Sequence, residues 1–175
     1  CSSNISARLS IFAKTSDIPQ IMAYNALMVE PPPPWPIEGI RETLAFLPVF
    51  EAEDFVAAVW EPPVTKVVDG REVTSMPYPH YSQEVDDFWA TFSRTGGFIN
   101  PYEPLPGDAS SWIRFHEKPI TLELLNTGTV DQLRRFLSLT KRGERFCDGH
   151  IESQLENGYI VEALRRIRSL IGDVV

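Results

Sequence analysis

A cysteine and a histidine lie three residues apart near the C-terminus, in the segment ERFCDGH that ends at His150. A cysteine at the start of a helix faces the positive end of the helix dipole, which favours the thiolate. A neighbouring histidine can then act as a general base. The spacing therefore supports a hypothesis in which Cys147 is a nucleophile and His150 its base. Glu144 or Asp148 would orient the histidine.

The same segment has a structural interpretation, which the sequence favours because free cysteines are commonly buried for packing alone. Asp148 is the expected N-cap of a short helix over residues 149–157, and Phe146 and Cys147 are expected to be covered by the flanking helices. In this interpretation Phe146 packs, Asp148 caps and Gly149 permits a close helix approach. Arg145 pairs with a carboxylate such as Glu156, and Gly158 helps to end the short helix.

Other catalytic signatures are missing from the sequence. His80, His116 and His150 lie far apart, and no two of them share a ligand spacing such as H-x3-H. The chain also lacks a Gly-rich phosphate loop, a G-x-S-x-G motif and a nicotinamide fingerprint. We therefore expect no metal and no cofactor.

Composition indicates a folded protein of 175 residues, 43% of them hydrophobic. No apolar run approaches the roughly 18 residues of a membrane span. The two cysteines, Cys1 and Cys147, cannot build a disulfide framework and fit a reducing compartment, so the expected location is the cytoplasm. The alternative is that Cys1 is the lipidated first residue of a mature lipoprotein, which would place the chain at a membrane.

The net charge of −8 is unevenly distributed. Residues 1–110 contain 6 basic and 15 acidic residues, and residues 111–175 contain 10 and 9. This acidic front disfavours nucleic acid and anionic membranes as partners. The basic residues of the C-terminal third could hold a phosphate, but we interpret them as the solvated side of helices: Arg134, Arg135, Lys141, Arg142, Arg145, Arg165, Arg166 and Arg168.

The proline run PPPPWP divides the chain into an extension, residues 1–36, and a single globular domain, residues 37–175. The extension contains a predicted short helix, DIPQIMAYNALM, whose apolar side is expected to meet another chain. In the domain, helical periodicity appears over residues 37–47, 83–95, 130–139 and 159–171. Asp69-Gly70 predicts a hairpin, MPYPHYS a rigid connection, and Ser82 and Thr129 are expected N-caps. The fold class is therefore α+β, mainly helical, with a small antiparallel sheet in the middle and a helical C-terminal third.

Prolines beside aromatic residues suit contact surfaces, since such segments are already extended before a partner binds. They could equally stiffen a linker and cover the hairpin. On the first interpretation the candidate partner-binding residues are Pro33, Trp35, Tyr78, Tyr81 and Tyr102.

The order LAFLPVFEAEDF, a DG hairpin, MPYPHYS, ERFCDG and ENGYIVEALRRI resembles a bacterial domain family of unknown function, over residues 37–171. Its members share an E-R-F-C-D-G core, then E-x-G and a terminal amphipathic helix. The resemblance implies no activity, cofactor or catalytic residue. We therefore predict a non-enzymatic accessory or regulatory module that binds a protein partner or self-associates. The alternative is a small enzyme centred on Cys147 and His150.

Overall fold

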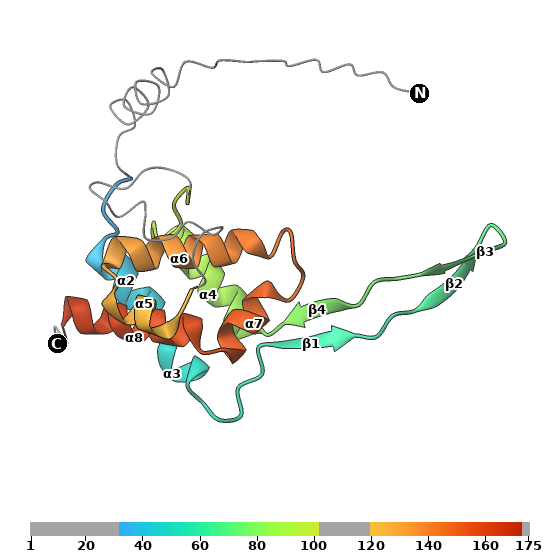
Figure 1. Ribbon diagram of the computed structural model, residues 1–175, viewed down its shortest axis with the longest axis horizontal. Coiled ribbons are helices and arrows are strands. Elements are labelled where there is room, and N and C mark those ends of the chain that lie inside the picture. Colours follow the sequence, from blue (N-terminus) through green and yellow to red (C-terminus); the bar gives the residue numbers. More distant parts are fainter. Residues whose placement is uncertain (1–31, 102–119, 173–175) are drawn as a thin grey trace, which may run out of the picture. The chain divides into compact units, whose positions relative to one another are not determined.

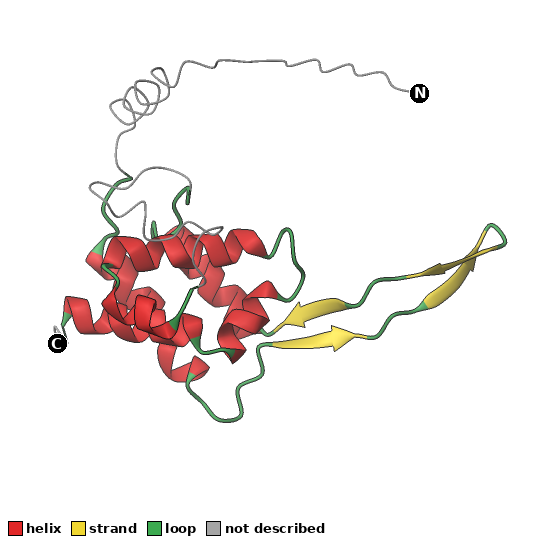
Figure 2. Cartoon of the chain, viewed as in Figure 1, coloured by secondary structure: helices red, strands yellow, loops and turns green. Residues whose placement is uncertain are grey.

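The computed structural model describes residues 32–101 and 120–172 of the chain. The described residues all belong to one unit of the chain, residues 31–175. This unit is α+β, as the sequence predicts: its helices form a body, and the middle of the sequence forms antiparallel strands (Figures 1 and 2). The predicted helix DIPQIMAYNALM, Tyr102 and His116 lie outside the described residues.

The helical body is built by packing of α2 on α4, α5 and α3 on α8, and α6 and α7 on each other and on α8. Its helices are α2 (Ile37–Leu44), α3 (Leu47–Phe50), α4 (Gln83–Arg94), α5 (Leu122–Thr127), α6 (Val130–Gly143), α7 (His150–Glu156) and α8 (Tyr159–Ile171). Aromatic rings fill the space between α2, α3 and α4, where Phe88 contacts Phe46, Phe50 and Trp89 edge-on. Phe88, Phe92, Leu133 and Leu164 are among the side chains removed from solvent, so one continuous core holds the body together.

Residues 58–81, which we call the arm, form a long two-stranded ribbon that projects from the body (Figure 1). At its base β1 (Ala58–Glu61) pairs antiparallel with β4 (Tyr78–Tyr81), with Trp60 opposite Pro79. Toward its tip β2 (Thr65–Val68) pairs with β3 (Arg71–Thr74). The tip turn places both Asp69 and Gly70 at positive φ, +50° and +74°, as a two-residue hairpin turn requires.

The buried guanidinium of Arg134, on α6, joins three segments of the domain. It donates to the carbonyl oxygens of Pro33 at 2.7 Å, of Gly97 at 3.0 Å, and of Gly96. Pro33 precedes α2, whereas Gly96 and Gly97 follow α4, so one side chain fixes the start of α2 and the end of α4 to α6. Its side chain is 2% exposed, and burial lowers the pKa of Arg134 from its ordinary value.

Local signals in the sequence predict several of these elements correctly. The Ser82 hydroxyl accepts from the amide of Val85, and Thr129 forms a capping box with Gln132. By contrast, MPYPHYS is not a mere connection, because its residues 78–81 form β4. Its prolines are tolerated since both strands of a two-stranded ribbon are edge strands. Helix α5, capped by Thr121, is missing from the sequence-based prediction.

The bonds of Arg134 predict a large loss of stability on substitution. Arg134→Met keeps most of the apolar stem but leaves three carbonyl groups without their donor. We expect the free energy of unfolding in urea to fall by at least about 3 kcal/mol. Arg168→Met, at an exposed position of α8, is the control and should change it by less than about 0.5 kcal/mol. Equal effects of the two substitutions would contradict a central role for Arg134.

Candidate functional site

The turn between α6 and α7 carries the segment GERFCDGH and lies at the base of the arm. The amides of Phe146 and Cys147 donate to the carbonyl of Gly143, at 2.9 and 3.1 Å, and reverse the chain after α6. The Phe146 side chain is 79% exposed and Cys147 is exposed as well. The expectation that these two residues are covered by flanking helices is therefore wrong.

Glu144 caps α7 from a position before the turn. The amides of Gly149 and Ile151 donate to its Oε1 and Oε2, each at 2.9 Å. Both carboxylate oxygens thus satisfy donors that a helix start leaves without partners, where negative charge is also favoured by the helix dipole. Asp148, the expected N-cap, is exposed and does not cap. The reason is that Gly149 occupies the N-cap position with a left-handed backbone, φ +80°, so the helix begins one residue later than predicted.

Two glycines of this segment allow neighbours to approach closely. A Cβ on Gly149 would overlap the indole ring of Trp60 from β1, and one on Gly143 would lie 2.6 Å from Cδ2 of His150. Gly149 therefore serves two purposes: it supplies the positive φ of the turn, and it makes room for the arm. The predicted close approach at Gly149 is made to Trp60 of the arm, not to another helix.

Both strands of the arm contact α7 or the turn that precedes it. From β1, Trp60 Nε1 donates to Oε2 of Glu152 at 2.5 Å. From β4, the buried Tyr81 hydroxyl lies near Glu144, outside regular hydrogen-bond geometry. Burial, followed by the adjacent Glu144 carboxylate, raises the pKa of Tyr81. The α6–α7 turn and the first turn of α7 thus hold the base of the arm from both strands.

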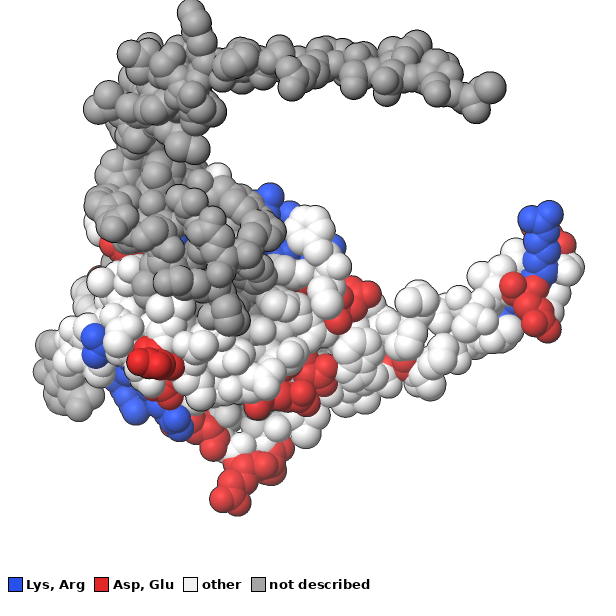
Figure 3. Space-filling view, viewed as in Figure 1, with Lys and Arg blue, Asp and Glu red and all other residues white. Residues whose placement is uncertain are grey.

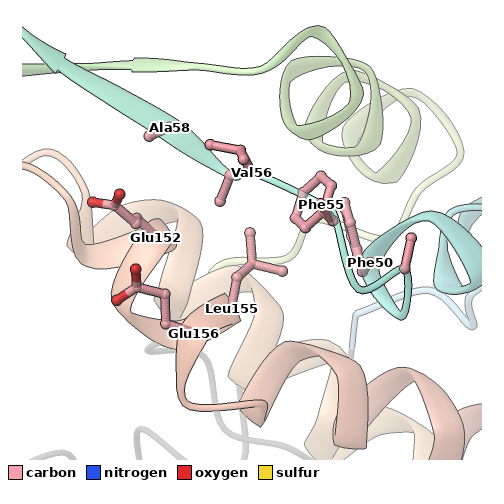
Figure 4. Close-up of a pocket in the computed structure, with 9 residues that line it drawn as sticks. Phe50, Phe55, Val56, Ala58, Glu152, Leu155 and Glu156 are labelled. Carbon is pink, nitrogen blue, oxygen red and sulfur yellow. The ribbon is translucent and has the colours of Figure 1, made fainter.

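A pocket of about 310 Å³, which we call the base pocket, lies beside this anchor. Its apolar wall includes Phe50, Phe55, Val56 and Leu155, and Figure 4 shows Leu155 pointing from α7 toward Val56 and Phe55. Glu152 and Glu156 supply two carboxylates on the same side of α7 (Figure 4). The base pocket therefore combines an apolar wall with negative charge at its rim.

His150 is half-buried at the start of α7. Its ring lies against Gly143, and burial lowers its pKa, while the nearby Glu144 carboxylate opposes that shift. Both oxygens of Glu144 accept from amides of α7, so capping α7 is one role of this carboxylate. The exposure of Cys147 supports the catalytic hypothesis.

A family model covers residues 36–173 of the chain, which include the body, the arm and the α6–α7 turn. The chain belongs to the family of unknown function DUF6508. No curated protein and no solved structure matches the chain. Membership confirms that the chain contains a domain of unknown function, and it assigns no activity to the DUF6508 domain.

The candidate partner-binding residues differ in their exposure to solvent. Trp35 is 6% exposed and packs edge-on against Phe92 in the core, so its side chain is no contact surface. Pro33 is exposed, and its carbonyl binds Arg134. Tyr81 is half-buried at the base of the arm, whereas Tyr78 is 54% exposed on it.

The basic residues of the C-terminal third also differ in exposure, since some are buried and others lie at the surface. Arg134 and Arg135 are 2% and 4% exposed, so the interpretation of this group as a solvated face is wrong for both. Arg165 is half-exposed and pairs with Glu51 at 2.7 Å.

In residues 32–101 and 120–172, no helix is long and apolar enough to span a membrane, and no cluster of three or more His, Cys, Asp or Glu side chains is placed to hold a metal.

Sequence reasoning missed the apolar surface of the arm. Of the fourteen large hydrophobic residues exposed in the described chain, eight lie on it: Val59, Trp60, Val64, Val67, Val68, Val73, Met76 and Tyr78. A signal was present, because the adjacent valines at 67 and 68 point to opposite faces of a ribbon, so a single covering layer would leave one of them exposed.

The capping role of Glu144 gives a test with a matched control four residues away. Glu144→Ala should lower the free energy of unfolding by roughly 1–3 kcal/mol, because two amides of α7 lose their acceptor. Asp148→Ala should change it by less than about 0.5 kcal/mol, since Asp148 is exposed and caps nothing. Urea titrations of both variants measure these losses. A larger loss of unfolding free energy for Asp148→Ala than for Glu144→Ala would identify Asp148 as the cap.

Proposed function

We propose that this DUF6508 domain is a non-enzymatic module that binds a protein partner through its arm. The observation that carries the proposal is the apolar exposure of the arm: Val67 is 71% and Met76 83% exposed, on a ribbon without a covering layer among the described residues. An isolated two-stranded hairpin is marginally stable in water, and its open edges readily pair with other chains. Exposed apolar surface of this extent is typical of interaction sites.

The anchoring of the arm also supports a binding role. Contacts of Trp60 with Glu152 and Gly149 fix the base of the arm on the body, so its orientation is set before any partner arrives. Pre-orientation lowers the entropic cost of association. A ribbon without these contacts at its base would lose this advantage.

Charge favours protein over nucleic acid as the partner. The arm is mostly uncharged between its base and its tip, and the tip carries charges of both signs (Figure 3). The net charge of −8 also disfavours nucleic acid, because its phosphates attract basic proteins. The cysteine content supports the cytoplasm as the place of binding.

Photo-crosslinking in the cells that make the protein tests the proposal. A photoreactive amino acid in place of Val67 or Met76 should give covalent adducts with a protein chain. The same amino acid in place of Arg168, an exposed residue of α8, should give few. If both arm positions give no more adducts than position 168, the arm does not bind protein.

The exposure of Cys147 favours one second candidate, a cysteine-dependent enzyme. In a Cys1→Ser background only Cys147 remains to react. We expect a thiol reagent to label it in the native protein at a rate close to that in the urea-unfolded chain, unchanged by His150→Ala. Native labelling many times faster, and slowed by His150→Ala, would favour the enzyme over the binding module.

A further inference from the structure

One face of the arm tip combines two valines with two cations. Residues opposite each other in an antiparallel ribbon share a face, and alternate residues along a strand do too. The pairs Lys66–Val73 and Val68–Arg71 therefore lie on one face, which we call the tip face. Val68 and Val73 are each 52% exposed, and both cations are exposed. The opposite face carries Thr65, Val67, Glu72 and Thr74.

The base pocket has the complementary chemistry. Its wall of Phe55, Val56 and Leu155 can cover aliphatic side chains, and its volume of about 310 Å³ has room for them. Glu152 shares one carboxylate oxygen with Trp60, while Glu156 is exposed and forms no ion pair with another described residue. Valines and cations on the tip face thus match apolar groups and carboxylates in the base pocket.

The tip of an arm cannot reach the base pocket of its own domain. Eleven residues separate Ala58 from Asp69, which in an extended strand is roughly 35 Å. The arm is a paired ribbon over most of this length, so it does not fold back. The surface that matches the base pocket must therefore come from another molecule.

We infer that this other molecule is a second copy of the same chain. Two arms lie side by side and antiparallel, so that each tip face covers the base pocket of the other copy. A two-fold axis through the middle of the paired arms brings both tips to both bases at once, because the two arms have the same length. Every contact then occurs twice, as in other two-fold dimers.

This pairing rests on the proposed function and names its partner. It places Val68 and Val73 against the apolar wall, and Lys66 and Arg71 near the carboxylates. It also covers apolar residues along the arm that one domain leaves in water. The ion pairs lie at the rim, so they guide register and association more than they add affinity.

Sedimentation of the purified full-length chain, over a range of concentrations reaching about 1 mM, tests the pairing, because even a weak dimer forms there. Wild type should associate to a dimer. The double variant Lys66→Glu with Arg71→Glu should raise the dimer dissociation constant at least tenfold, and Glu156→Arg should weaken the dimer as well. Glu72→Lys, on the opposite face of the same strands, is the matched control and should leave the dissociation constant within about twofold. Thermal melts show that each variant is folded.

Mixing the tip-reversed double variant with the Glu156→Arg variant gives the most specific test of the pairing. In a heterodimer of the tip-reversed and Glu156→Arg variants, one contact joins a negative tip to a base pocket that now carries a cation at position 156. The other contact retains both wild-type surfaces, so the mixture should dimerise more tightly than either variant alone. A wild type that stays monomeric, a dimer indifferent to tip reversal, or a mixture no tighter than its components would overturn the inference. Crosslinks from the arm to a different protein would then still support the proposed function, whereas their absence as well would remove both.

Discussion

The arm depends on one close contact, that of the Trp60 indole ring with the backbone of Gly149. The contact exists because Gly149 has no side chain and because Glu144 holds the start of α7 in place through two backbone amides. Trp60 then bonds Glu152 one turn further along α7. Without this arrangement β1 would lose its contacts with Gly149 and Glu152, and an isolated ribbon of this kind has little stability of its own. The motif that first suggested an active site thus explains how the arm is attached.

A division of labour follows between the two parts of the domain. The body has a continuous core and fixes α2 and α4 to α6 through Arg134, so it accounts for the stability of the fold. The arm adds apolar surface that remains in water, which costs free energy in a monomer. The proposed pairing of two copies would offset that cost by covering part of the surface. A base pocket with two carboxylates, and a tip with two cations, make a second copy a suitable cover.

Much of the fold could be predicted because its signals are local. The Asp69-Gly70 turn and the caps of α4 and α6 are each specified by residues within one turn of the chain. The candidate site depends on contacts distant in sequence, and there local reasoning fails. Pro79 lies in a strand because β1 pairs with it, and Trp35 is buried because Phe92 lies beside it. Glu144 caps α7 only because the intervening turn reverses the chain, which its sequence alone does not reveal.

Hydrogen exchange of the arm amides as a function of protein concentration tests the central claim most directly, since it observes the arm itself. Paired arms predict that amides of residues 64–75 exchange rapidly in dilute protein and become protected as concentration rises. Amides in the core of α6 and α8 should stay protected throughout, because they belong to the stable body. Arm amides whose exchange is the same at every concentration would contradict the claim that the arm is the surface on which two copies meet.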